Sequence, residues 1–160
     1  KAKNGKPEFQ PLFWRIGKMS KREQVLNALF ARLSALPDVE VKRNAVLPVK
    51  IPDKGLIVLR DGNVGEPDVL LSPACYVFHH KAEIEVLIQQ EDDADNDAKL
   101  DRVLEAIGRI ISVDVTLSGL IDYMRAEPPE FIEQPVDGGL TIKGAIVPIV
   151  LEYTTINALL

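Results

Sequence analysis

The two histidines of this 160-residue chain, His79 and His80, are adjacent in YVFHHKAEIEV, residues 76–86. A pair of imidazoles could hold a metal ion or transfer protons. However, this stretch alternates apolar and polar residues, and neighbours on a strand point to opposite faces. The two rings therefore cannot bind one ion. We expect His80 to be a satisfied, partly buried side chain on the apolar face and His79 to be exposed.

Cys75 and His79 are four residues apart, a pattern that could suggest a thiol and its base. On a strand this spacing is about 13 Å, whereas proton transfer requires about 3 Å. The spacing therefore predicts no dyad, and Cys75 is expected to be a small buried apolar residue. A single cysteine cannot form an intramolecular disulfide, which makes a reducing cytoplasm the default compartment.

Residues 93–97, DADND, carry the alternating oxygen ligands that open a calcium-binding loop. The sixth position of that loop is Ala98 instead of glycine, and the twelfth is Leu104 instead of a bidentate glutamate. We therefore expect a solvated helix start, with weak surface binding of a divalent ion as the alternative. Phosphate-binding glycine loops, a nucleophile elbow and a zinc-binding helix motif are all absent from the sequence, so no enzyme, metal or cofactor is predicted.

Two amphipathic helices and several strands are expected to form the framework. Ser20 begins a capping box with Glu23, before an apolar stripe that ends at Pro37. A second stripe runs from Leu100 to Ile111. Strands are expected at residues 39–41, 56–60, 68–71, 76–88, 120–126 and 142–154, with a long irregular connection between the last two. A helical turn over residues 117–124 is the alternative to the strand at 120–126. The order predicts an α+β fold in which two helices cover a mostly antiparallel sheet.

The charge of the chain is unevenly distributed. Residues 1–18 carry five cations and one anion, or +4, which leaves −5 − 4 = −9 for the remainder. We expect residues 1–18 to be an N-terminal extension or arm and residues 19–160 to form one domain. An acidic body of this kind repels nucleic-acid backbones. No apolar run reaches the length of about 20 residues that crosses a bilayer, so no membrane partner is expected.

The last strand is apolar on both faces, yet it contains Pro148, which cannot donate to a strand ladder. We therefore expect an edge or bulged strand whose outer face is covered by another subunit.

Four stretches resemble tail terminator (tail completion) proteins of long-tailed bacteriophages, prophages and gene-transfer particles. They are SKREQVLNALFARLSAL (20–36), GLIVLRDGNVGEP (55–67), YVFHHKAEIEVLI (76–88) and IKGAIVPIVLEYTT (142–155). The resemblance spans most of residues 19–160. It implies a virion protein, assembled in the bacterial cytoplasm, whose hexameric ring caps the head-proximal end of the tail tube. Such a ring stops tail growth and joins the tail to the head connector, while DNA passes through its lumen without sequence-specific binding.

The resemblance also implies contact residues. Subunit or partner contacts are expected at Ala145, Val147, Ile149, Leu151, Phe131, Asn63 and Val64. An acidic patch that could line the lumen and repel DNA is expected at Asp92, Asp93, Asp95 and Asp97. Two alternatives remain open: another neck protein for head closure or tail completion, and a small cytoplasmic enzyme that uses Cys75 or unpaired carboxylates.

Overall fold

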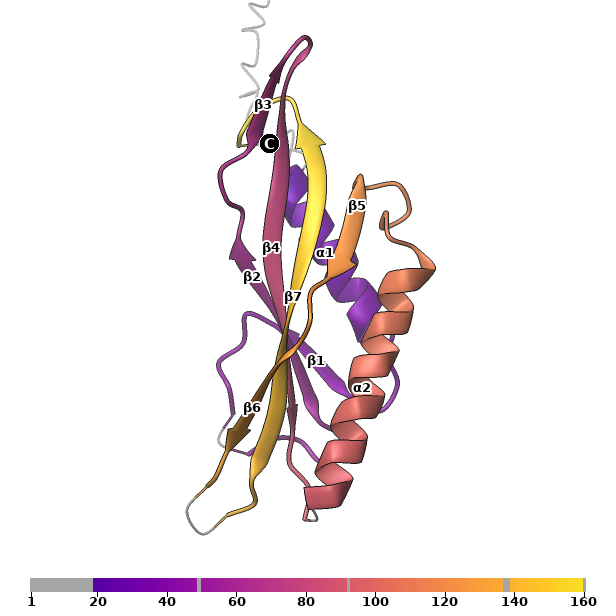
Figure 1. Cartoon of the computed structure of the whole chain (residues 1–160), viewed down its shortest axis with the longest axis vertical. Helices are drawn as coiled ribbons and strands as arrows, with labels where there is room; N and C mark the ends of the chain where they lie inside the picture. Colours follow the sequence, from indigo (N-terminus) through magenta and orange to yellow (C-terminus); the bar gives the residue numbers. More distant parts are fainter. Residues whose placement is uncertain (1–18, 49, 92, 137–138, 160) are drawn as a thin grey trace, which may run out of the picture.

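The computed structural model describes residues 19–48, 50–91, 93–136 and 139–159. These residues form two helices and a seven-stranded sheet (Figure 1). In chain order the elements are α1 (Lys21–Ser34), β1 (Glu40–Arg43), β2 (Leu56–Asn63), β3 (Asp68–Leu71), β4 (Ala74–Ile88), α2 (Asp93–Val113), β5 (Tyr123–Ala126), β6 (Glu130–Gln134) and β7 (Ile142–Thr155). The predicted α+β class is confirmed. The extension predicted at residues 1–18 lies outside the described residues.

Two long strands, β4 and β7, form the axis of the elongated molecule (Figure 1). They pair antiparallel from Tyr76↔Thr155 to Ile88↔Lys143. The strand order is β1-β2-β4-β7-β5, with β3 paired to the start of β4 and β6 paired to the start of β7. Each long strand is thus flanked by shorter strands along its length. The β3–β4 hairpin projects at one end, and the β6–β7 connection lies at the other (Figure 1).

Both helices cover the same face of the sheet. Period-two alternation places Ile84 and Val86 of β4 beside Ala145 and Val147 of β7 on that face, and all four are buried. The helices contribute their apolar stripes to the same cluster, with Val25, Leu26, Leu29 and Leu33 from α1 and Leu100, Ile107 and Ile111 from α2. This layer is the main core, as the helical spacing in the sequence predicts.

A second, smaller cluster lies on the opposite face of the sheet. Ile51 covers Leu56, Val58 and Leu87, all of them buried. Ala45 and Ile51, in the connection from β1 to β2, provide this cover. These two strands pair parallel. Parallel neighbours require a crossover of about a dozen residues. The sheet is therefore mixed, although every other pairing among the described strands is antiparallel.

Ser20 caps α1 as predicted, because its hydroxyl accepts a hydrogen bond from the amide of Glu23 at 3.3 Å. The reciprocal half of the capping box was predicted for the carboxylate of Glu23. The two oxygens of this carboxylate instead accept hydrogen bonds from Arg43 and Asn27. The guanidinium is a charged donor, so it is the stronger partner.

The last strand is neither the predicted edge strand nor, where it pairs with β4, a bulged one, because that pairing keeps one register throughout. Cover of its outer face by another subunit stays a prediction. β7 is central, with β4 on one side and β5 and β6 on the other. The carbonyl of Pro148 accepts a hydrogen bond from the amide of Glu127, in the gap between β5 and β6. The N–H and C=O of a strand residue point to the same side, so the missing N–H of Pro148 also faces this gap and costs β4 no hydrogen bond.

The connection before β7 is more ordered than the predicted irregular segment. Glu130–Gln134 pairs with Ile142 to Ile146 as strand β6, and β5 is confirmed at Tyr123–Ala126. Pro128 and Pro129 lie between these two strands. The prolines therefore interrupt one long edge and divide it into two short strands.

Candidate interaction surfaces

His80 lies on the helix-covered apolar face, as predicted, and is fully buried where partial burial was expected. Its Nε2 lies 2.5 Å from the carbonyl oxygen of Asp61, and its Nδ1 lies 3.2 Å from the hydroxyl of Tyr153. A carbonyl can only accept, so Nε2 carries the proton and Nδ1 accepts from Tyr153 in a neutral ring. Burial lowers the pKa of His80 and raises the pKa of Tyr153 to about 12.

His79 points to the opposite face and is half exposed, as predicted. Its ring nitrogens lie 3.3 Å from a carboxylate oxygen of Asp68 and 3.4 Å from one of Glu152. It thereby connects β3 to β7 across β4. The two histidines thus serve different faces of the sheet and share no site.

Arg43 forms the most extensively bonded ionic group near α1. Its guanidinium donates to Glu23 of α1 at 2.7 and 2.9 Å and to Asp61 of β2 at 2.7 and 2.9 Å. These bonds raise the pKa of Arg43 and lower the pKa of both carboxyls. The group joins a helix to two strands, so its physical role is to hold elements together.

Asp114 organises the turn that follows α2. Its carboxylate accepts hydrogen bonds from Thr116 and Ser118 and from Arg32 of α1 at 2.6 Å. These donors hold the pKa of Asp114 far below its usual range. The strongly shifted carboxyls of the described residues are therefore explained by structural bonds.

No three His, Cys, Asp or Glu side chains gather as a metal site within the described part of the chain. Cys75 lies on β4 opposite Leu70 of β3 and is partly exposed, which differs from the buried position expected for it.

The four contact residues predicted on the last strand lie inside the subunit. Ala145, Val147, Ile149 and Leu151 have 5% or less of their surface exposed, because α1 and α2 cover the face from which they project. Their apolar character is explained by the core of one chain. They offer no surface to a partner in this structure, so their predicted role in subunit contact is wrong.

The other three predicted contact residues are more accessible. Phe131 is 65% exposed on the outer strand β6, where Ile132 is also exposed. Asn63 is exposed at the end of β2, and its side-chain oxygen accepts a hydrogen bond from the amide of Gly65. Val64 is partly buried against the main core. Phe131 and Asn63 therefore remain available to a neighbour.

The predicted acidic patch is divided. Asp92 lies outside the described residues, and of Asp93 only its position at the start of α2 is described. Asp95 and Asp97 are both exposed, but they lie two residues apart on a helix and point to different sides. Asp95 faces residues 36–39, whereas Asp97 forms an ion pair with Lys143 of β7 at 2.8 Å. These two carboxylates thus do not form one continuous face.

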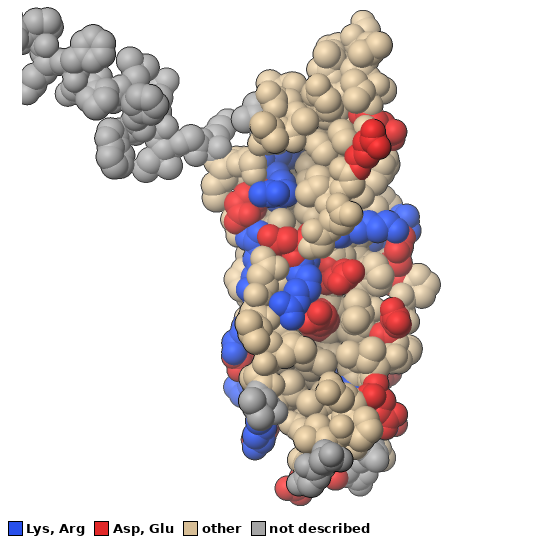
Figure 2. Space-filling view, turned by 90° about the vertical axis from the view of Figure 1, so that its left-hand side faces the viewer, with Lys and Arg blue, Asp and Glu red and all other residues tan. Residues whose placement is uncertain are grey.

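An exposed apolar surface that no sequence motif indicates lies at the tip of the β3–β4 hairpin. Val69 and Leu70 are each 53% exposed and Leu71 is 85% exposed. The end of the molecule that carries this hairpin shows no charged side chain in Figure 2, whereas mixed charges cover the surface below it. Contiguous exposed apolar groups are more common at protein interaction sites than elsewhere on a protein surface, so this hairpin is a candidate interaction surface.

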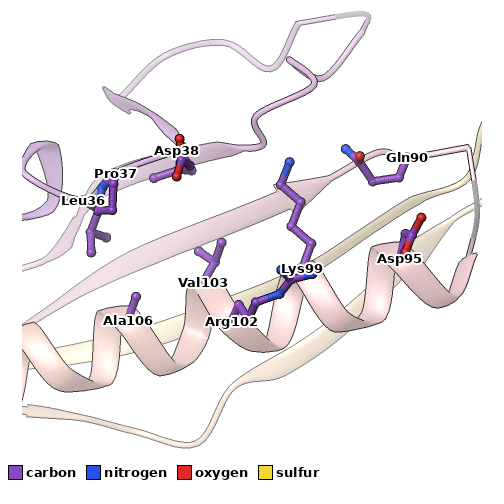
Figure 3. Close-up of a pocket in the computed structure, with 10 residues that line it drawn as sticks. Leu36, Pro37, Asp38, Gln90, Asp95, Lys99, Arg102, Val103 and Ala106 are labelled. Carbon is purple, nitrogen blue, oxygen red and sulfur yellow. The ribbon is translucent and has the colours of Figure 1, made fainter.

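A pocket of about 440 Å³ lies between α2 and the segment after α1, residues 36–39 (Figure 3). We refer to it as the α1–α2 pocket. Leu36 and Pro37 face Val103 and Ala106 across it, and Lys99 and Arg102 add cations. The volume is within the range of about 300–1,000 Å³ typical of binding pockets. None of the groups with strongly shifted pKa lines it.

Comparison of the sequence with models of known protein families finds no match, and comparison with curated proteins finds no significant relative. Within the described residues, neither helix combines the length and apolar character needed to span a bilayer.

Proposed function

We propose that this chain is a structural subunit of a phage-like particle, which assembles as a ring at the head-proximal end of the tail tube. The ring ends tail growth and joins the tube to the head connector, and DNA crosses its lumen without sequence-specific contacts. This role is what the sequence resemblance to tail terminators implies. A mixed α+β sheet with helices on one face is compatible with such a subunit.

The observation that carries the proposal is the exposed apolar surface of the β3–β4 hairpin, with Leu71 85% exposed. Such a surface is suited to contact with another protein, and it is not a concave site that could enclose a substrate. Phe131 on β6 adds an exposed aromatic side chain near the other end of the molecule. A ring contact requires two different patches on one subunit, because each subunit meets its two neighbours through different patches, and the hairpin is suited to be one of them.

Electron microscopy of particles assembled without the gene would test this role. We expect tails of irregular, extended length that are not joined to heads. Tails of normal, uniform length joined to heads would refute the proposal. Heads and tails of normal length that fail to join would instead favour a different neck component, such as a head-closure protein.

A further inference from the structure

The β3–β4 hairpin has apolar residues on both of its faces. Residues 69–78, VLLSPACYVF, contain no charged residue and no histidine. All four residues of β3 are exposed, and alternation places Val69 and Leu71 on one face and Leu70 on the other. The pairing of β4 with β7 begins at Tyr76, so only β3 accompanies Ala74 and Cys75. A two-stranded ribbon of this kind is marginally stable in water by itself, and a partner that covers it would stabilise it.

The α1–α2 pocket has the complementary properties. Its walls are apolar at Leu36, Pro37, Val103 and Ala106, and Lys99 and Arg102 provide two cations on the same helix. The base of the hairpin carries the exposed carboxylates of Glu66 and Asp68. The pocket also contains the carboxylates of Asp38 and Asp95, so its charge is mixed. An apolar tip with acidic flanks would thus meet apolar walls beside Lys99 and Arg102, whose charges Asp38 and Asp95 balance.

The hairpin and the pocket belong to different parts of the molecule. The hairpin forms one end, whereas the pocket lies beside residues 95–106, in the half of α2 nearer the other end (Figure 1). A chain therefore cannot place its hairpin in its own pocket, and a second copy must supply one or the other.

We propose that the β3–β4 hairpin of one copy of this chain inserts its tip, Val69 to Leu71, into the α1–α2 pocket of the next copy. The contact is heterologous, since different patches meet, and repetition of it produces a ring when the rotation closes. This inference rests on the proposed function and identifies the surfaces through which the subunits of the ring meet.

Two substitutions, each made alone in the 160-residue chain, disable the hairpin tip and the pocket one at a time. Leu71→Asp places a charge on the hairpin tip, and Val46→Asp is its control because Val46 is 91% exposed in a different segment. Ala106→Arg fills the pocket with a long side chain while retaining a strong helix former. We expect sedimentation velocity to show oligomers of the unchanged chain and of Val46→Asp. The dissociation constants of Leu71→Asp and Ala106→Arg should each rise at least about tenfold.

An equimolar mixture of Leu71→Asp and Ala106→Arg provides the decisive measurement. Each variant retains one intact patch, so the mixture should form a heterodimer and nothing larger. Undiminished assembly of either variant, or a mixture without heterodimer, would overturn the inference. So would an unchanged chain that stays monomeric at every concentration tested.

A cysteine pair tests the same contact independently of these two substitutions. In a Cys75→Ser background, Leu71→Cys with Ala106→Cys should yield a ladder of disulfide-linked oligomers under mild oxidation. Leu71→Cys with Val46→Cys is the matched control and should give no such ladder, apart from symmetric dimers. Equal ladders from both pairs, or no ladder from the first, would contradict hairpin insertion. Either result would leave the proposed function intact, because tail length in particles without the gene decides that separately.

Discussion

At the scale of single residues, Arg43 connects the two layers of the fold through one guanidinium. Its side chain is 17% exposed and binds a carboxylate of α1 and a carboxylate of β2. Hydrogen bonds between charged groups are stronger than neutral ones, and partial burial limits their screening by water. The position of α1 on the sheet should therefore depend on this residue.

Substitution of Arg43→Met should lower the free energy of unfolding at pH 7 by about 1–2 kcal/mol, after allowance for the partial exposure of both carboxylates. Arg109→Met is the matched control, because Arg109 binds Glu105 on the exposed surface of α2. Arg109→Met should change the free energy of unfolding only slightly. Urea denaturation of both variants provides the measurement, and equal losses would contradict the role of Arg43.

The same ion pairs predict a dependence on pH. Arg43 lowers the folded-state pKa of Glu23 and Asp61 below their ordinary values of 4.5 and 3.8. The stability that the two ionised carboxylates contribute is thus fully present above their ordinary pKa values. It is lost as pH falls through these values toward the lowered pKa values of the folded state. We expect the difference in stability between the original chain and Arg43→Met to shrink between about pH 5 and pH 3. A difference that stays constant over this range would show that the carboxylates do not cause it.

His80 should produce a separate effect at higher pH. Burial lowers its pKa from 6.5 in the folded state, so protons bind more readily to the unfolded chain. Stability should therefore decrease as pH falls below about 6.5. The variant His80→Gln should lack this decrease, whereas His79→Gln should retain it. Urea denaturation at a series of pH values gives the stability profile of each chain. Parallel profiles for the original chain and His80→Gln would show that His80 does not cause the decrease.

At the scale of elements, Gly62 determines how β2 passes β4. The register shifts between Arg60 and Asn63, and Gly62 has φ of 67°. A Cβ atom at this position would lie 1.9 Å from the carbonyl oxygen of Lys81 on β4. Only glycine permits this close approach of the two backbones.

Gly62→Ala should therefore destabilise the protein by more than the 1–2 kcal/mol that a left-handed backbone alone costs alanine. Gly65→Ala is the matched control, since Gly65 has φ of 73° but nothing within 4 Å of its Cβ position. Urea midpoints should show a clearly larger loss for Gly62→Ala. Equal losses of stability in the two variants would mean that β4 can move away from the new Cβ atom at position 62 without an energetic cost.

At the scale of the whole molecule, one main core unites both helices with the sheet. Its buried residues extend from Val25 to Tyr153 in the described part of the chain. The sequence predicts one domain over residues 19–160, and truncation tests where it begins. A chain that begins at Met19 should thus retain the free energy of unfolding of the 160-residue chain. A lower urea midpoint after this truncation would show that residues 1–18 contribute to the fold.

The sequence by itself determined the elements with strong periodicity. The stripes of α1 and α2 and the alternation along β4 predicted their positions and their buried sides, because local spacing decides which side chains share a face. It also determined that His79 and His80 separate. β6 was missed because the prolines before it and the exposure of all five of its residues conceal a strand that pairing with β7 creates.

Only the tertiary structure decided which apolar residues form the core and which reach the surface. The last strand and Val69 to Leu71 are similarly apolar in sequence, yet α1 and α2 cover one face of the strand, with Ala145, Val147, Ile149 and Leu151, and no described element covers the second group. Pro148 suggested an edge, and only the gap between β5 and β6 explains how it fits a central strand. The α1–α2 pocket likewise combines residues far apart in the chain. Local sequence encodes which side chains are apolar, whereas long-range packing determines what each of them meets.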